Sequence, residues 1–289
     1  MKTSCFPLNQ SWPLETAAQL ACLLESSAAK LGNVHPQAAF SDMHFGHFAA
    51  SSLIIGRCLA ESREPTVGTS VLAAVSAIKQ AVSRNTYLGT ILLLVPLARA
   101  LSDQSITSVH ELSNSVRNVL GQLTAQDSHD IYRAIASASP GGLGNRASMD
   151  VLGDAPEDIL QAMAQVASFD AVARQYINGF ADVLGILHPW LIEELQRFDE
   201  PLAAICRLQL RWLAHEPDGL IVRKAGKQIA QQVQQLASEA LSSNEGAHAT
   251  SLAKLDRFLR ADGHRRNPGT TADLIAATLF VQLTLAQPQ

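Results

Sequence analysis

The chain has 289 residues, of which 47% are apolar, and its formal net charge is −4. This composition is sufficient for a sizeable core and excludes an intrinsically disordered chain, while the acidic balance excludes a general nucleic-acid binder. The longest apolar run, over 91–98, is far shorter than the ~20 residues that span a bilayer, and the first residues do not form a signal-peptide pattern. We therefore expect a cytoplasmic protein without a membrane or nucleic-acid partner.

Apolar residues recur at helical spacing through most of the chain, and period-two alternation is almost absent. The spacing predicts a first helix beginning near Leu14. Ser108 and Glu111 form a capping-box sequence that predicts a helix start before 109–123. Further helices are predicted over 71–82, 86–100, 156–166, 168–186 and 271–284.

Two of these segments, 86–100 and 271–284, are apolar on nearly all sides, which is typical of helices inside a bundle. No internal repeat or low-complexity linker divides the chain. We therefore expect one all-α domain over 1–289, a bundle of about eleven to thirteen helices with an active-site cleft between them.

Five polar clusters interrupt the apolar helices, and each needs a reason, because a buried polar group without a partner costs about 1–3 kcal/mol. The first begins at Lys30 and ends at Asp42. A helix is expected to end at Gly32 and a new one to start near Asp42. Asp42 is then either only an N-cap or, with Asn33 and His35, part of a pocket wall.

The second cluster, over 83–89, lies between two very apolar helices. Asn85 or Thr86 is suited to cap the second helix. Gly89 costs that helix about 1 kcal/mol relative to alanine, which a close approach of a ligand or of backbone at this turn would explain.

The third cluster holds Asp127 and Asp130, three residues apart and therefore on one helix face, followed by Tyr132 and Arg133. Two carboxylates on one face suit Mg²⁺, which also binds phosphate oxygens; the alternative is a capped, solvated first turn. The glycine-rich run over 140–144 is able to turn backbone N–H groups toward an anion, although it is also ordinary loop chemistry.

The fourth cluster is a stripe of residues spaced by four along 168–186, namely Asp170, Arg174, Asn178 and Asp182. It is interpreted either as part of a polar site or as a solvent-facing row of ion pairs, each worth a few tenths of a kcal/mol.

The fifth cluster combines 218–227 with 265–273. Arg223 and Lys224 are expected in the first turns of a long helix. Residues 267–271 precede an apolar helix, whose free N–H groups would form an anion site. The alternative is a capping sequence in which Thr270 and Asp273 have box spacing.

These motifs, in this order, resemble those of the triphosphoribosyl-dephospho-CoA synthases over about residues 15–285. They are Lys30-Leu-Gly-Asn-Val-His-Pro36 with Ser41-Asp-Met43, Arg84-Asn-Thr-Tyr-Leu-Gly89, Tyr132-Arg-Ala-Ile135 with the run over 140–144, Asp218-Gly-Leu-Ile-Val-Arg-Lys224, and Asn267-Pro-Gly-Thr-Thr-Ala-Asp-Leu-Ile-Ala276. The resemblance implies an all-α enzyme that joins ATP to 3′-dephospho-CoA and releases adenine. Its product is the precursor of the prosthetic group of an acyl carrier protein.

The resemblance also implies roles for the polar clusters. Asp42, Asn85 and Asp130 are the expected catalytic residues, with Asp42 as a general base or a stabiliser of the cationic transition state. Asp42, Asp127 and Asp130 are expected to hold Mg²⁺ on the phosphates. The residues expected to bind the substrate or its phosphates are Lys30, Asn33, His35, Thr86, Gly89, Tyr132, Arg133, Gly141, Gly142, Gly144, Arg174, Asn178, Arg223, Lys224, Asn267, Gly269, Thr270 and Thr271.

The chain departs from the family pattern at several positions. Tyr87 and Leu88 stand where a histidine and a lysine are usual, Phe40 stands in place of a histidine, and His35 in place of an aspartate. This pattern resembles a divergent branch associated with tetrahydromethanopterin-type one-carbon cofactors, so a related phosphoribosyl transfer to another acceptor is a second hypothesis. A non-catalytic nucleotide-binding helical protein is a third, and it would leave the charged motif residues dispersed on the surface.

Overall fold

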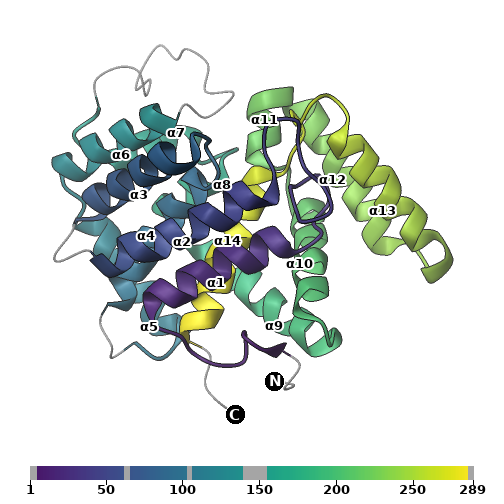
Figure 1. The fold of residues 1–289 in the computed structure, drawn as a ribbon, viewed down its shortest axis with the longest axis horizontal. Coiled ribbons are helices and arrows are strands. Elements are labelled where there is room, and N and C mark those ends of the chain that lie inside the picture. The colour runs from purple at the N-terminus through teal and green to yellow at the C-terminus, as the bar shows by residue number, and fades with distance from the viewer. Residues whose placement is uncertain (1–4, 62–65, 103–105, 139–154, 286–289) are drawn as a thin grey trace.

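The structure, a computed structural model, describes residues 5–61, 66–102, 106–138 and 155–285 (Figure 1). Within these ranges the chain forms fourteen α-helices and one π-helix, and no strand is present. The expected all-α class is therefore confirmed. The helices slightly outnumber those expected, because helices break at Gly179 and Gly226, inside segments that were predicted as continuous helices. None of the helices in these ranges is long and apolar enough to cross a membrane.

The first half of the described chain contains α1 to α7. Their bounds are α1 Leu14–Ser27, α2 Phe45–Glu61, α3 Val67–Val82, α4 Leu88–Leu101, α5 Val109–Gly121, α6 Ala125–Ala138 and α7 Ile159–Val166. The second half contains α8 Ala171–Asn178, the π-helix Val183–Leu187, α9 His188–Arg197, α10 Pro201–His215, α11 Gly219–Ala225, α12 Lys227–Ser242, α13 Glu245–Arg260 and α14 Gly269–Leu285.

Helix α14 runs through the middle of the molecule (yellow in Figure 1) and contacts α1, α4, α8, α9, α10, α11 and the π-helix. Every residue from Leu274 to Leu283 is buried, as is nearly all of α4. The two segments that are apolar on nearly all sides are therefore the interior helices, as predicted. The polar residues in their first turns are consequently held deep inside the protein.

The helices pack around two hydrophobic cores. The larger core joins α1 to α9 with α14, and the smaller core lies between α10, α11, α12 and α13. Helix α10 belongs to both, since Leu208 packs in the larger core and Leu213 in the smaller one. Helices α12 and α13 pack against each other at one side of the molecule (Figure 1).

Local signals placed some helix ends correctly and others incorrectly. The capping box is confirmed: the Glu111 N–H donates to Ser108 Oγ at 3.2 Å, and the Ser108 N–H donates to Glu111 Oε2 at 3.0 Å. The continuous helix over 168–186 is wrong, because α8 ends at Gly179, whose φ is +68°. A Cβ on Gly179 would lie 2.6 Å from the side chain of Arg117, which would have to move, and the positive φ itself favours glycine.

Two other predicted boundaries shift. Helix α1 ends at Ser27, five residues before Gly32, which instead adopts φ +70° in the following loop. The next helix begins at Phe45, so Asp42 lies in the loop before it and is not its N-cap. Asp42 is thereby left with its side chain about half exposed.

Candidate active site

A cavity of about 370 Å³ lies between the helices. Its walls come from α1, α2, α4, α6, α7, α8, α11 and the first turn of α14, together with the loops that precede α2, α4, α8 and α14. Segments from both ends of the chain thus converge on one space, which is large enough for a nucleotide-sized ligand.

Many of the residues expected to form the site line this cavity. From the first, second and third clusters they are Asn33, Asp42, Asn85, Thr86, Gly89 and Tyr132, and from the fifth they are Arg223, Lys224, Asn267, Gly269 and Thr270. They come from segments more than 200 residues apart in sequence. Other expected site residues do not line it, namely Lys30, His35, Asp127, Asp130, Arg133, Arg174, Asn178 and Thr271. Gly141, Gly142 and Gly144 lie outside the described residues.

The carboxylate of Asp127 caps helices and does not face the cavity. Its Oδ1 accepts a 2.7 Å hydrogen bond from the Gly68 N–H, and its Oδ2 accepts from the N–H and hydroxyl of Thr124 at 2.9 and 2.7 Å. Burial opposes ionisation, but these hydrogen bonds outweigh it and keep the pKa of Asp127 below its ordinary value. The capped first turn, not a metal site, is the environment that the structure gives it.

Asp130 also has protein partners outside the cavity. Its carboxylate accepts from Gln126 Nε2 at 3.1 Å and lies 3.4 Å from Arg133 Nη1. No cluster of three or more potential metal-ligating His, Cys, Asp or Glu side chains occurs within the described part of the chain. The expectation that Asp127 and Asp130 share a magnesium ion at the phosphates is therefore corrected, because neither carboxylate reaches the cavity.

Arg174 and Asn178 form a network that fixes the break after α8. Arg174 Nε donates to Asp182 at 2.7 Å, and its Nη2 donates to both carboxylate oxygens of Glu216 at 2.7 and 2.8 Å. Asn178 Nδ2 also donates to Asp182, at 3.3 Å. The guanidinium of Arg174 is occupied by two carboxylates, so the structure places it in the scaffold and not at a phosphate.

The N-terminus of α14 is occupied by a side chain. Asp218 Oδ2 accepts from both the N–H and the hydroxyl of Thr271 at 2.7 Å, while its Oδ1 caps α11 through Leu220 and Ile221. Burial raises the pKa of Asp218 in spite of these donors. The anion that this helix start attracts is thus a carboxylate of the protein itself, and the expected phosphate site on Thr271 is corrected.

Lys30 is fully buried and does not line the cavity. Its Nζ lies 2.8 Å from Glu25 Oε1 and also donates to the Glu25 backbone carbonyl. Glu25 itself lines the cavity. Lys30 therefore acts on the site only through Glu25. His35 pairs with Gln37 and lies away from the cavity.

Two cationic side chains of α11, Arg223 and Lys224, line the cavity. Arg223 and Lys224 lie in the last turn of the short helix α11, not in the first turns of a long helix, because Gly226 with φ +93° separates α11 from α12. Lys224 Nζ is 3.5 Å from Asn267 Oδ1, and Arg223 Nη1 is 3.7 Å from Asp170 Oδ2. The Nε of Arg223 is buried and has no hydrogen-bond partner among the described residues.

Burial and the neighbouring Arg223 lower the pKa of Lys224. A ligand with negative charge would offset the repulsion between Arg223 and Lys224 and would accept a hydrogen bond from the Nε of Arg223. This part of the cavity wall therefore favours an anionic group.

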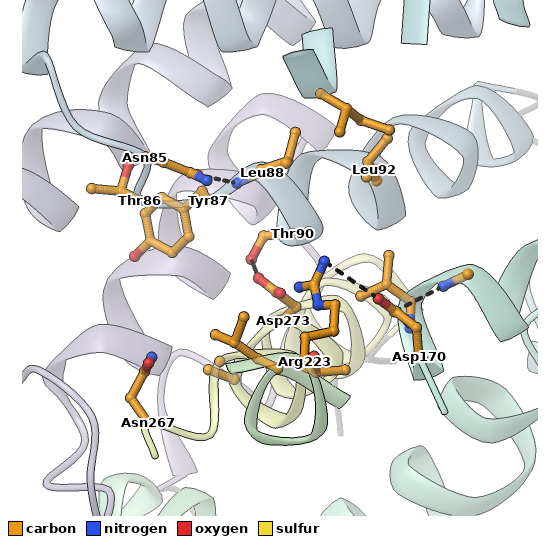
Figure 2. A pocket seen from close by; sticks show the side chains of 18 of the residues that line it. Asn85, Thr86, Tyr87, Leu88, Thr90, Leu92, Asp170, Arg223, Asn267 and Asp273 are labelled. Carbon is orange, nitrogen blue, oxygen red and sulfur yellow. Dashed lines mark hydrogen bonds and ion pairs between the residues drawn. The ribbon is translucent and has the colours of Figure 1, made fainter. Parts of the chain in front are cut away.

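The loop before α4 is anchored to the protein by its own polar side chains. Asn85 Oδ1 accepts from the Leu88 N–H at 3.4 Å (Figure 2), but the N-cap of α4 is Tyr87, so the predicted cap at Asn85 or Thr86 is wrong. Thr86 donates its hydroxyl to Ser51 at 2.8 Å. Tyr87 donates its hydroxyl to the Cys22 carbonyl at 2.8 Å, and burial raises its pKa well above the ordinary value. Tyr87 therefore presents ring carbon to the cavity, and Leu88 adds a second apolar surface.

The cavity also contains a polar pair that sequence reasoning did not assign. The Thr90 hydroxyl donates to Asp273 Oδ1 at 2.7 Å (Figure 2). Asp273 was expected only as the second member of a capping box with Thr270, but its carboxyl group bonds to Thr90 instead. The sequence feature that marks Asp273 as unusual is an acidic residue in a segment that is otherwise apolar on nearly all sides. Glu25, which also lines the cavity, belongs to none of the predicted clusters, whereas Asp170 was in the fourth cluster but not among the expected ligand-binding residues.

A family model described as CitG, ATP:dephospho-CoA triphosphoribosyl transferase, matches residues 11–288. The chain belongs to this family. It is therefore a transferase of the triphosphoribosyl-dephospho-CoA synthase type, as its motifs predict.

A solved structure has the same fold. The crystal structure of a candidate triphosphoribosyl-dephospho-CoA synthase from Archaeoglobus fulgidus aligns with a TM-score of 0.65 and 24% sequence identity. The alignment covers 82% of this chain and 98% of that chain. No curated protein matches this triphosphoribosyl transferase family member.

Proposed function

We propose that the cavity binds ATP and an alcohol acceptor, 3′-dephospho-CoA, and transfers the triphosphoribosyl group between them. The observation that carries the proposal is that motifs of this transferase family, from segments far apart in sequence, converge on one cavity whose wall includes two cationic side chains. In the reaction, the acceptor oxygen forms a bond to ribose C1′ while the bond from C1′ to adenine breaks. The bonding electrons leave with adenine, which takes up the proton lost by the acceptor.

Arg223, Lys224 and Asn267 are proposed to bind the triphosphate. All three line the cavity, Lys224 Nζ lies 3.5 Å from Asn267 Oδ1, and Arg223 has a buried donor without a hydrogen-bond partner among the described residues. Charge-assisted hydrogen bonds to phosphate are the strong ones, and a fixed triphosphate also fixes the ribose that follows it.

Asp42 is the proposed carboxylate for a magnesium ion on these phosphates. Its side chain lines the cavity and is about half exposed, and its Oδ1 lies 3.4 Å from His264 Nε2. Mg²⁺ commonly binds through one or two carboxylates plus substrate phosphates and water, so a single protein carboxylate fits this ion. The bound ion would supply positive charge to the phosphate oxygens. ATP as the donor is also consistent with the cytoplasmic location expected from the sequence.

The identity of the acceptor is the least constrained part of the proposal. Tyr87 and Leu88 line the cavity without a charge, at positions where the motif usually has a histidine and a lysine. This uncharged wall favours an acceptor that carries fewer anionic groups there. A hydroxyl-bearing precursor of a tetrahydromethanopterin-type cofactor is therefore kept as the second candidate.

The test is adenine release by the purified protein with ATP and Mg²⁺, measured by chromatography. Dephospho-CoA should accelerate release, and a product with the mass of the triphosphoribosyl adduct should accumulate in equal amount. Assays without acceptor give the background of ATP hydrolysis. If neither dephospho-CoA nor a panel of alternative alcohol acceptors yields adenine, the transferase proposal is wrong for this chain.

A further inference from the structure

The carboxyl group of Asp273 lies against the first turn of α4 in a space that only glycine leaves open. A Cβ built on Gly89 would be 2.1 Å from Asp273 Oδ2, well inside van der Waals contact. On the other side of the carboxyl group, Thr90 donates to Oδ1 at 2.7 Å. Two consecutive residues of α4 therefore fix the position of one side chain on α14.

Asp273 shares the cavity wall with both apolar and cationic side chains. In Figure 2 the guanidinium of Arg223 is drawn level with Asp273, and Leu88 and Leu92 lie above both. In ATP the ribose lies between the base and the triphosphate. A nucleotide with its phosphates at Arg223 and its base against Leu88 and Leu92 would thus bring its glycosidic bond close to Asp273.

The surroundings of Asp273 favour its neutral form. Burial raises its pKa to about 8, and nearby acidic groups add to this, whereas the Thr90 hydrogen bond acts in the opposite direction. Because Thr90 donates to Oδ1, the proton belongs on Oδ2, the oxygen that faces Gly89. The charged or titratable groups that surround it are Glu25 with its partner Lys30, Cys22, Tyr87, Asp170 with Arg223, and Asp218.

We propose that Asp273 is the general acid of the transfer, donating the Oδ2 proton to a ring nitrogen of adenine as the C1′–N bond breaks. This inference rests on the proposed function. The electrons of the broken bond remain on adenine, the acceptor oxygen bonds to C1′, and the acceptor proton returns Asp273 to its neutral form. No net proton is gained or lost, and no further reactant is needed. Thr90 is a positioning residue that keeps the proton on Oδ2.

The decisive experiment compares two leaving groups in Asp273→Asn. With ATP, which needs protonation of adenine, turnover should fall by about 10²–10⁴-fold. With the p-nitrophenyl riboside 5′-triphosphate as donor, the leaving phenolate needs no proton, so the loss should stay within about tenfold. Equal losses with both donors would overturn the assignment, as would full activity of the variant with ATP.

A second variant covers the case in which Asp273→Asn does not fold. Thr90→Val keeps the carboxyl group but removes the hydrogen bond that lowers its pKa. The alkaline limb of the pH–rate profile should therefore move to higher pH, and an unmoved limb would contradict the proposal. Wild-type protein that releases no adenine from ATP would instead refute the proposed function itself, so the two failures are distinguishable.

Discussion

The hydroxyl of Thr90 and the carboxylate of Asp273 are 183 residues apart in sequence and 2.7 Å apart in space. They join α4 to α14, the two interior helices, in surroundings that are otherwise mostly apolar. Burying a polar pair in such surroundings lowers the stability of the fold. Polar groups that are buried at this cost are typical of functional sites. Gly89 belongs to the same arrangement because it leaves room for the carboxyl group.

Gly89→Ala should reduce turnover strongly with little loss of helix stability. The added methyl would overlap Asp273 Oδ2 and displace it from Thr90, while alanine itself favours a helix by up to about 1 kcal/mol. Gly121→Ala is the matched control, because a Cβ there meets nothing within 4 Å. Steady-state adenine release and thermal unfolding would be measured on both. Unchanged turnover in Gly89→Ala would contradict the close contact.

Asp273→Asn should alter the pH dependence of stability. The folded-state pKa is raised to about 8, so between the unfolded-state value near 3.8 and about 8 the native protein holds a proton that the unfolded chain has lost. Wild-type stability from this group is therefore lost as pH rises, by at most about 1.4 kcal/mol per pH unit.

The asparagine variant should not show this loss. Its free energy of unfolding in urea, relative to wild type, should rise from pH 6 to pH 8 and then level off. Asp262→Asn removes an exposed carboxylate and serves as the control. A constant difference across this pH range would mean that Asp273 is ionised throughout.

Lys224→Gln should raise the KM for ATP about tenfold or more, because a hydrogen bond to a charged group contributes about 1.5–3 kcal/mol. The effect should shrink for donors with fewer phosphates. Lys227 is exposed and lies three residues further along the chain. Lys227→Gln therefore tests whether the loss of any nearby positive charge is sufficient to raise the KM for ATP. Equal KM values for the two variants would remove Lys224 from the phosphate site.

Asp42→Asn should abolish most turnover while leaving the melting temperature nearly unchanged. The side chain of Asp42 is about half exposed, and its carboxylate contacts His264. Its replacement should therefore remove few interactions that stabilise the fold. A raised Mg²⁺ requirement in the residual activity would agree with a role at the metal. A variant that unfolds, or one that retains full activity, would show that Asp42 serves the loop and not the reaction.

The amino-acid sequence by itself determined the fold class and the location of much of the cavity lining. Helical spacing, the capping box at Ser108 and the apolar segments over 86–100 and 271–284 are local patterns, and local patterns decide which segments are helical. The clusters near Asn85, Arg223 and Asn267 lie at helix boundaries, where polar residues stand out in an otherwise apolar sequence. These clusters were therefore recognisable from the sequence as candidates for one site.

The tertiary structure decided what each polar side chain does. Asp127 was expected to bind a metal ion and Thr271 a phosphate, but packing brings the Gly68 N–H to Asp127 and the Asp218 carboxylate to Thr271. Asp273 has the sequence character of a cap, but packing places it beside Thr90 in a cavity wall with a raised pKa. A hydrogen bond acts over about 3 Å, and a pKa depends on burial, so both are fixed only when distant segments meet.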